Sequence, residues 1–216
     1  GNAMQDVIEF INIKGIIPSD KMIYVDGANS NQDLDLDGSR ANLGSLAGII
    51  GTGPETAIFS ASNFKISNLA GGFLVKGIQF QNEDEGEAVL EFENIGGTIK
   101  VENVVLSSNT GADGGIKISN ARGAVEIRDT RLDYTGGDGI NIDNTAGTGN
   151  VTLTNVSATY GYADGIEINT RGAVLLNGVN SSRNNNGTGG YGAYITTQKG
   201  LTVKNSVFDN NDLSGL

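Results

Sequence analysis

Three aspartates that each precede a glycine recur along the chain and are the first candidates for chemistry. Asp113, Asp138 and Asp164 begin the related segments Asp-Gly-Gly-Ile, Asp-Gly-Ile and Asp-Gly-Ile. If these copies stack, the carboxylates lie about 5 Å apart, close enough to raise one another's pKa or to bind a cation. A similar separation, about 5 to 5.5 Å, serves retaining glycoside hydrolysis. The alternative is ordinary turn chemistry, because Asp before Gly accepts hydrogen bonds from the turn backbone.

The outward side of the predicted strands forms a second candidate surface. Strand alternation points Glu167 and Tyr194 away from the core, in a polar strip with one aromatic residue. Carbohydrate-binding faces have this composition, and so does any solvated sheet. The residues predicted to bind a ligand are Asp138, Asp143, Asp164, Glu167 and Tyr194. If the protein is an enzyme, the predicted catalytic residues are Asp138, Asp164, Glu167, Arg131 and Arg171.

A third candidate is a calcium site near the N-terminus. Asp33, Asp35 and Asp37 alternate before Gly38, the spacing at which hard oxygen ligands open a calcium loop. The twelfth position of such a loop is Gly44 instead of the bidentate Glu of an EF-hand. A solvated acidic loop is the alternative interpretation. We therefore expect no required cofactor, with Ca²⁺ as the one candidate ion.

Composition narrows the chemistry further. The 216 residues include no Cys and no His, which excludes thiolate and imidazole zinc sites, Ser-His-Asp triads and Cys nucleophiles. Catalysis would have to rest on carboxylates, Lys, Arg, Tyr or a hard cation. The formal net charge of −11 disfavours a nucleic-acid partner. No apolar run approaches the roughly 18 residues of a membrane helix, so we expect no membrane insertion.

The elements that must position these residues are short strands in a repeat of about 25 residues. Apolar residues alternate with polar ones in segments such as 125–129 and 151–155, and Gly, Asn and Asp separate the segments. The connections are too short for helical crossovers, so we predict an all-β, right-handed parallel β-helix with three short strands per coil. A ladder of corner side chains is predicted at Asn103, Asp129, Asn155, Asn177 and Asn205.

The chain divides into three predicted parts. Residues 1–3 are typical of the remnant of a cleaved tag, residues 4–57 form an N-terminal cap with irregular first coils, and residues 58–216 form the β-helix. For residues 6–11 a capping helix and a first strand both remain open. The pattern stops within a repeat at Leu216, so we expect a truncated end whose unpaired strand edge promotes self-association.

The repeated Gly-Ile-x-Ile strand, Gly turn and Val-x-Ile/Leu-x-Asn/Asp strand resemble the repeats of the right-handed parallel β-helix superfamily that includes pectin lyases. The resemblance covers roughly residues 73–216, and its near-tandem copies most resemble large bacterial surface or secreted proteins of adhesin type. It implies a secreted or cell-surface scaffold or adhesin segment that binds a polysaccharide or cell-surface glycan without catalysis. The alternative is a polysaccharide lyase, epimerase or glycoside hydrolase acting through surface carboxylates.

Overall fold

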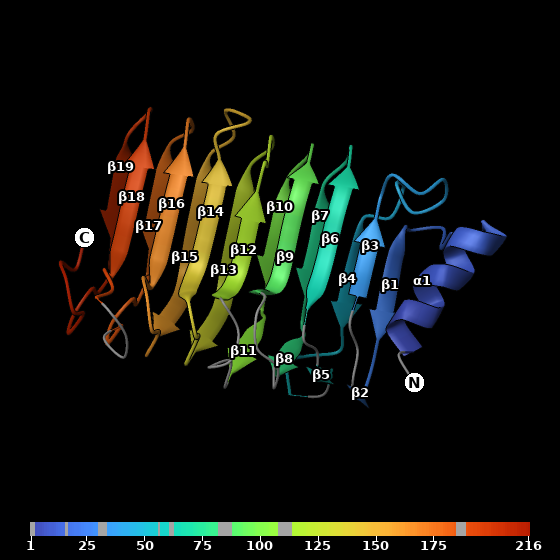
Figure 1. The fold of residues 1–216 in the computed structure, drawn as a ribbon, viewed down its shortest axis with the longest axis horizontal. Coiled ribbons are helices and arrows are strands. Elements are labelled where there is room, and N and C mark those ends of the chain that lie inside the picture. Colours follow the sequence, from blue (N-terminus) through green and yellow to red (C-terminus); the bar gives the residue numbers. More distant parts are fainter. Residues whose placement is uncertain are drawn as a thin grey trace.

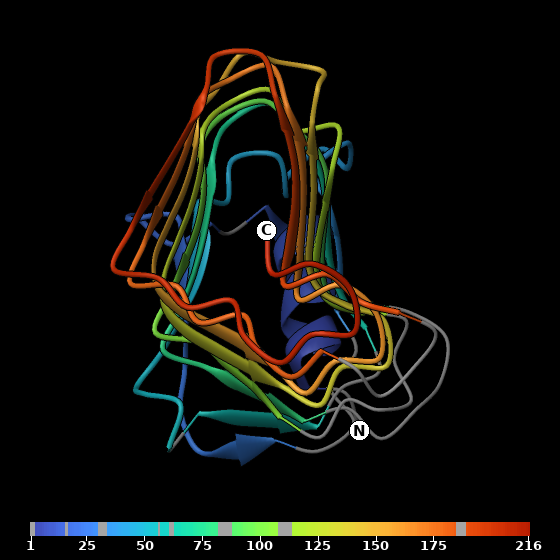
Figure 2. The ribbon, with the colours of Figure 1, turned by 90° about the vertical axis from the view of Figure 1, so that its left-hand side faces the viewer.

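Short parallel strands wind into a right-handed β-helix of about 6 turns, spaced about 26 residues apart in the sequence (Figure 1). The computed structural model describes residues 3–15, 17–29, 34–55, 57–60, 63–81, 88–107, 114–184 and 189–216. Viewed along the axis, the coils superpose in a three-sided outline (Figure 2). The all-β parallel β-helix expected from the repeat is confirmed.

Each coil passes through three faces in the same order, which we call face 1, face 2 and face 3. Face 1 consists of β1 (Met22–Val25), β4 (Gly48–Gly51), β7 (Phe73–Lys76), β10 (Ile99–Glu102), the first half of β13 (Val125–Asp133), the first half of β15 (Val151–Thr159), β17 (Val174–Asn177) and β19 (Leu201–Lys204). Face 2 consists of β2 (Ala28–Asn29), β5 (Ile58–Ser60), β8 (Gln79–Gln81), β11 (Val105–Ser107) and the second halves of β13 and β15.

Face 3 is a sheet of its own and has the candidate site on its outer side. It consists of β3 (Leu34–Asp37), β6 (Phe64–Leu69), β9 (Ala88–Ile95), β12 (Gly114–Ser119), β14 (Asp138–Asn144), β16 (Ile166–Thr170) and β18 (Ala193–Thr197). All of these strands pair in parallel with the equivalent strand of the next coil. Each internal strand is therefore held on both sides, which makes the face a rigid platform.

The core consists of apolar columns that run along the axis. Ile116, Ile140 and Ile166 stack in register on face 3, as the alternation predicts, and all three are buried. On face 1, Val101 lies in a second column that begins at Ile23 in the first coil. The columns are filled because every other side chain of each strand points inward. The members of the second column are Ile23, Ile49, Val75, Val101, Ile127, Leu153, Leu176 and Val203.

The corner between face 1 and face 2 carries the predicted ladder, with one member displaced. Asn103, Asp129, Asn155 and Asn205 adopt left-handed backbone angles there, with φ between 49° and 52°. In the intervening coil the corner residue is Gly178, and the predicted member Asn177 precedes the corner by one residue. The prediction for Asn177 was wrong by one residue. It aligned asparagines only, whereas Gly178 also adopts the left-handed φ that the corner requires. Its side chain still accepts a hydrogen bond of 3.1 Å from the Asn205 amide.

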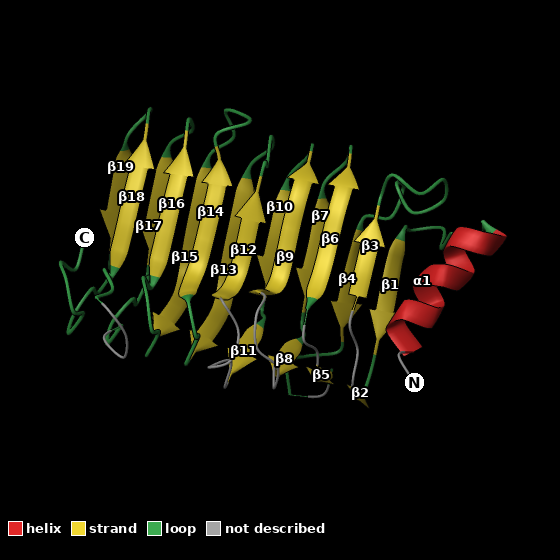
Figure 3. Cartoon of the chain, in the orientation of Figure 1, coloured by secondary structure: helices red, strands yellow, loops and turns green. Residues whose placement is uncertain are grey.

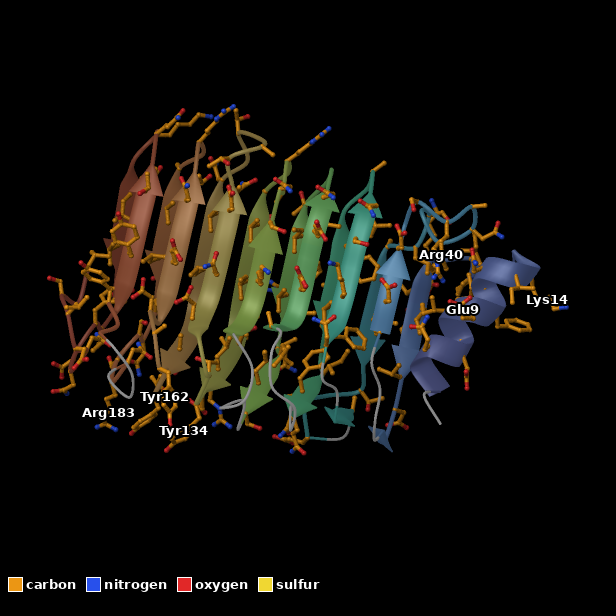
Figure 4. The ribbon with its side chains drawn as sticks, viewed as in Figure 1. Glu9, Lys14, Arg40, Tyr134, Tyr162 and Arg183 are labelled. Atoms are coloured by element: carbon orange, nitrogen blue, oxygen red, sulfur yellow. The ribbon has the colours of Figure 1, made fainter. Side chains whose placement is uncertain are left out.

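Helix α1 (Ala3–Lys14) closes the N-terminal end of the solenoid (Figure 3). Ile8 and Ile11 are buried against the first coils, and the Glu9 carboxylate pairs with Arg40 (Figure 4). This decides the alternative left open for residues 6–11 in favour of a capping helix. Parallel pairing begins at Met22, so the solenoid includes much of the segment 4–57. Among the described residues, no helix is long and apolar enough to span a membrane.

The C-terminal end has no comparable cover in the part of the chain that the structure describes. All four residues of β19 are exposed, including Leu201 and Val203, although these side chains continue the inward columns of earlier coils. Val207, Leu213 and Leu216 are also exposed. The last coil therefore presents apolar side chains and unpaired strand backbone at its edge.

Candidate functional site

Three carboxylates meet where the chain enters face 3 in two successive coils. Asp138 begins β14, Asp164 lies just before β16, and Glu167 is the second residue of β16. One oxygen from each lies within 4.8 Å of the others, and all three side chains are half-buried. The parallel register brings them together, because Asn141 of β14 pairs with Glu167 of β16. We call Asp138, Asp164 and Glu167 the acidic cluster.

Hydrogen bonds hold the acidic cluster in one arrangement. The Asn141 amide Nδ2 donates to Asp138 Oδ2 and to Glu167 Oε2, both at 2.8 Å. The backbone N–H of Asp164 donates to Asp138 Oδ1 at 3.1 Å, and the N–H of Tyr191 donates to Asp164 Oδ1 at 2.8 Å. Asn141 thus cross-links two coils through their carboxylates.

Two of the three carboxyls favour their protonated form more than an isolated carboxyl does. Burial raises the pKa of Asp164 above its ordinary 3.8, and the charge of Asp138 raises it further, against the Tyr191 N–H that lowers it. Burial also raises the pKa of Glu167 above 4.5, followed by the charge of Asp138, a hydrogen bond with Asp138 and the charge of Asp164. No ion pair among the described residues joins a Lys or Arg to this cluster. Protons or a cation would therefore stabilise it.

Two tyrosines stand beside the acidic cluster. Tyr194 of β18 lies opposite Glu167 of β16 in the strand register. Its ring is therefore next to the Glu167 carboxylate on the outer side of face 3. Tyr194 is 50% exposed, and the centroid of its ring lies 5.5 Å from that of the tilted Tyr191 ring. An aromatic surface thus adjoins carboxylate and amide oxygens on one rigid sheet.

The remaining predicted residues lie elsewhere. Asp143 is on face 3 at the far end of β14, where its carboxylate accepts from the Thr145 N–H and hydroxyl at 2.9 and 2.6 Å. Arg131 is on face 2 and pairs with Asp133 at 3.0 Å. Arg171 follows the C-terminal end of β16 and is exposed. The fold therefore does not bring either predicted arginine to the acidic cluster.

The predicted calcium loop has another arrangement in its described part. Asp33 lies outside the described residues. Asp37 accepts hydrogen bonds from the Asn68 amide, the Ser39 N–H and the Ser39 hydroxyl, which lower the pKa of its carboxyl in that order of size. Asp35 is an exposed residue of β3 and lies opposite Lys65 of β6 in the strand register. Among the described residues, the donor set that suits a hard cation is the acidic cluster instead.

The aspartate column itself needs one correction. Gly114, and not Asp113, pairs with Asp138, because the double glycine of that coil moves the register by one residue. Asp113 lies outside the described residues. The repeat also places Asn141 in the outward column with Glu167, as the structure has it. Its hydrogen bonds to two carboxylates were not predicted, because they depend on side-chain geometry between coils.

Comparison of the chain with protein-family profiles, curated proteins and solved structures finds no match. The resemblance to pectin-lyase-like and adhesin-type repeats therefore stays a prediction. The structure by itself establishes the class of protein, which is a right-handed parallel β-solenoid with a helical N-terminal cap.

Proposed function

We propose that the protein is an extracellular β-helix scaffold or adhesin segment that binds glycans on face 3. The observation that carries this proposal is the exposed Tyr194 ring next to the half-buried carboxylates of the acidic cluster. Sugars offer an apolar C–H face and a rim of hydroxyl groups. An aromatic ring packs against the first, and carboxylate oxygens accept hydrogen bonds from the second.

Rigidity supports a binding role. Glu167 and Tyr194 sit on neighbouring parallel strands, and Asn141 holds Glu167 to Asp138. A ligand that meets such a surface does not have to order it first, so less affinity is lost on binding. Secreted and cell-surface glycans are the ligands of this chemistry, and for that reason we place the function at the bacterial cell surface or outside the cell.

Hydrolysis of a glycan is the second candidate function. The raised pKa of Glu167 beside Asp138 favours it, since a glycosidase needs one carboxyl that stays protonated and one that is ionised. A lyase or epimerase has less support, because neither Arg131 nor Arg171 reaches the acidic cluster.

A glycan array with the purified protein tests the binding role. We expect Tyr194→Ala and Glu167→Gln each to abolish the array signal. Tyr24→Ala is the matched control, because Tyr24 is 66% exposed on β1 of the first coil, far along the solenoid (Figure 1). Array binding that survives both face 3 variants would contradict the proposal. The glycans captured by the wild-type protein are then assayed for new reducing ends, whose appearance would favour hydrolysis instead.

We also propose that two copies of the chain associate through their C-terminal edges. The edge exposes Leu201 and Val203 together with the unpaired backbone of β19. Helix α1 covers the opposite end of the solenoid, so a C-terminal edge cannot add to the N-terminal end of another copy. Edge-to-edge pairing of two equivalent C-terminal coils closes the assembly at a dimer.

A further inference from the structure

Two tyrosines from successive coils stack at the corner between face 2 and face 3. Tyr134 follows the last residue of β13, Asp133, and Tyr160 follows the last residue of β15, Thr159. Asp133 and Thr159 are opposite each other in the strand register, so the two tyrosines leave the sheet at equivalent positions. Their ring centroids lie 5.0 Å apart, with an angle of 13° between the ring planes. We call Tyr134 and Tyr160 the tyrosine pair.

The backbone of this corner holds the tyrosine pair in place. Both residues have left-handed backbone angles, with φ of 60° and 61°, and the N–H of Tyr134 donates to the carbonyl oxygen of Thr159 at 3.1 Å. In the next two coils Arg183 and Asn210 occupy this position, with φ of 62° and 54°. Asn tolerates such angles better than a bulky residue does, so the turn itself does not favour tyrosine. Two strained tyrosines in succession therefore point to a use for their rings.

The two rings differ in how firmly they are held. The Arg183 guanidinium lies over the Tyr160 ring, 5.3 Å from its centroid, and donates a hydrogen bond to the Tyr160 hydroxyl. Tyr160 thus contacts Tyr134 of the preceding coil and Arg183 of the following coil. Tyr134 is 46% exposed and lies at the lower edge of the solenoid in Figure 4. A reagent in the solvent can therefore reach one ring of a pair whose other ring is fixed.

We propose that the tyrosine pair is a site of oxidative cross-linking, at which a haem peroxidase acting with hydrogen peroxide joins the two rings. One electron leaves each phenol, and each hydroxyl proton goes to water. The two phenoxyl radicals form a carbon–carbon bond between positions ortho to the hydroxyls. The hydrogens of these two carbons then move to the phenol oxygens. Overall the pair loses two hydrogen atoms, and one molecule of hydrogen peroxide is reduced to two molecules of water.

The product is a covalent link between two coils of a chain that can form no disulfide, because it contains no Cys. Neighbouring coils of a solenoid are otherwise held by their mutual contacts alone. A cross-link removes conformational freedom from the unfolded chain, as a disulfide does, and so stabilises the folded state. The proposal does not rest on the glycan site of face 3 or on the C-terminal edge, with which it shares no residue.

The other tyrosines provide internal controls. Tyr191 and Tyr194 are also in contact, but their planes are tilted by 38°, and both residues belong to one coil. Tyr24 is 66% exposed and Tyr162 is 42% exposed. Among the described residues, neither of these two rings contacts another tyrosine. If exposure alone determined the reaction, Tyr24 would react first and would link separate molecules.

The test treats the whole chain at low concentration with a haem peroxidase and hydrogen peroxide, and then digests it with a protease that cleaves before aspartate. This digestion places Tyr134 in the peptide 133–137 and Tyr160 in the peptide 143–163. In the protein that remains monomeric on a denaturing gel, we expect mass spectrometry to find the two peptides joined, with two hydrogen atoms fewer than their sum. The joined peptide should be absent without peroxide.

Variants identify the two rings. Tyr134→Phe and Tyr160→Phe should each abolish the joined peptide, because phenylalanine has no phenol to oxidise. Tyr162→Phe and Tyr24→Phe are the matched controls and should leave it unchanged, and circular dichroism checks that each variant is folded. A joined peptide that persists in Tyr160→Phe and disappears in Tyr162→Phe would assign the bond to another residue and overturn the proposal.

Stability and independence supply two further readouts. The urea midpoint of the treated wild type should rise above that of the untreated protein, whereas treatment should not raise the midpoint of Tyr134→Phe. Tyr194→Ala should still form the joined peptide, so failure of the face 3 site and failure of the tyrosine pair are distinguishable. Cross-links only between separate molecules, or no joined peptide at all, would refute the proposal.

Discussion

Removing the buried contact of the capping helix should destabilise the N-terminal end of the solenoid by a measurable amount. Ile8 in α1 is 0% exposed, whereas Ile13 in the same helix is 72% exposed. We expect Ile8→Ala to destabilise the protein and Ile13→Ala to have almost no effect. The pair has matched chemistry, because both variants remove the same atoms and raise helix propensity equally.

The size of the effect follows from the burial. Ile8→Ala removes three buried carbon groups, which at about 0.8 kcal/mol each account for roughly 2.4 kcal/mol. The cavity left under the helix adds to this, so the free energy of unfolding should fall by about 2–5 kcal/mol. Ile13→Ala should remain within about 0.5 kcal/mol of the wild type. In a solenoid each coil contacts only its neighbours, so the loss should be concentrated in α1 and the first coils.

Urea denaturation followed by far-UV circular dichroism measures the total loss, and hydrogen exchange with mass spectrometry locates it. We expect faster exchange in β1 and β3 of Ile8→Ala, with unchanged exchange in β14 and β16. Equal stability of the two variants would show that α1 does not cover the first coil. Uniform loss of protection along the whole chain would contradict the assumption of nearest-neighbour stability.

Three other perturbations follow from the site, the C-terminal edge and the ladder. Because the pKa of Glu167 is raised in the folded state, the contribution of its carboxyl to stability falls as the pH rises above 4.5. In thermal melts from pH 5 to 7, the melting temperature of Glu167→Gln should therefore decline less than that of the wild type. Identical declines would argue against a raised pKa of Glu167. Val203→Lys should convert a dimer to a monomer in sedimentation equilibrium, because a lysine at the strand edge opposes pairing. Val7→Lys, at a similarly exposed position on α1, should leave the dimer intact. A monomeric wild type at high concentration would contradict edge pairing. Gly178→Ala should cost about 1–2 kcal/mol in urea denaturation because φ is +68°, and Gly178→Asn should cost less, since Asn and Asp hold the same corner in neighbouring coils. Equal costs for the two Gly178 variants would mean that left-handed strain is not what the corner selects against.

Alternation within each short segment and recurrence of the Gly-hydrophobic pairs were sufficient to predict the parallel β-helix. The reason is that burial on one face of a strand imposes a period of two, and stacking of equivalent strands imposes a constant repeat. The columns that contain Ile116 and Val101 follow from those two rules alone, and the structure has them in that register. Positive φ at the corners also follows from the residue types, since Asn, Asp and Gly tolerate it best.

Tertiary structure decided the register wherever turn length varies, and with it the composition of each site. One extra glycine places Gly114 beside Asp138, and Gly178 replaces Asn177 at its corner, because pairing between coils is set by strand hydrogen bonds and not by the spacing of like residues. The same long-range pairing places Glu167 beside Asn141 and keeps Arg171 at the opposite end of β16. A carboxylate's neighbours in the next coil lie some 26 residues away in the chain, so only the wound structure determines which charges share a surface.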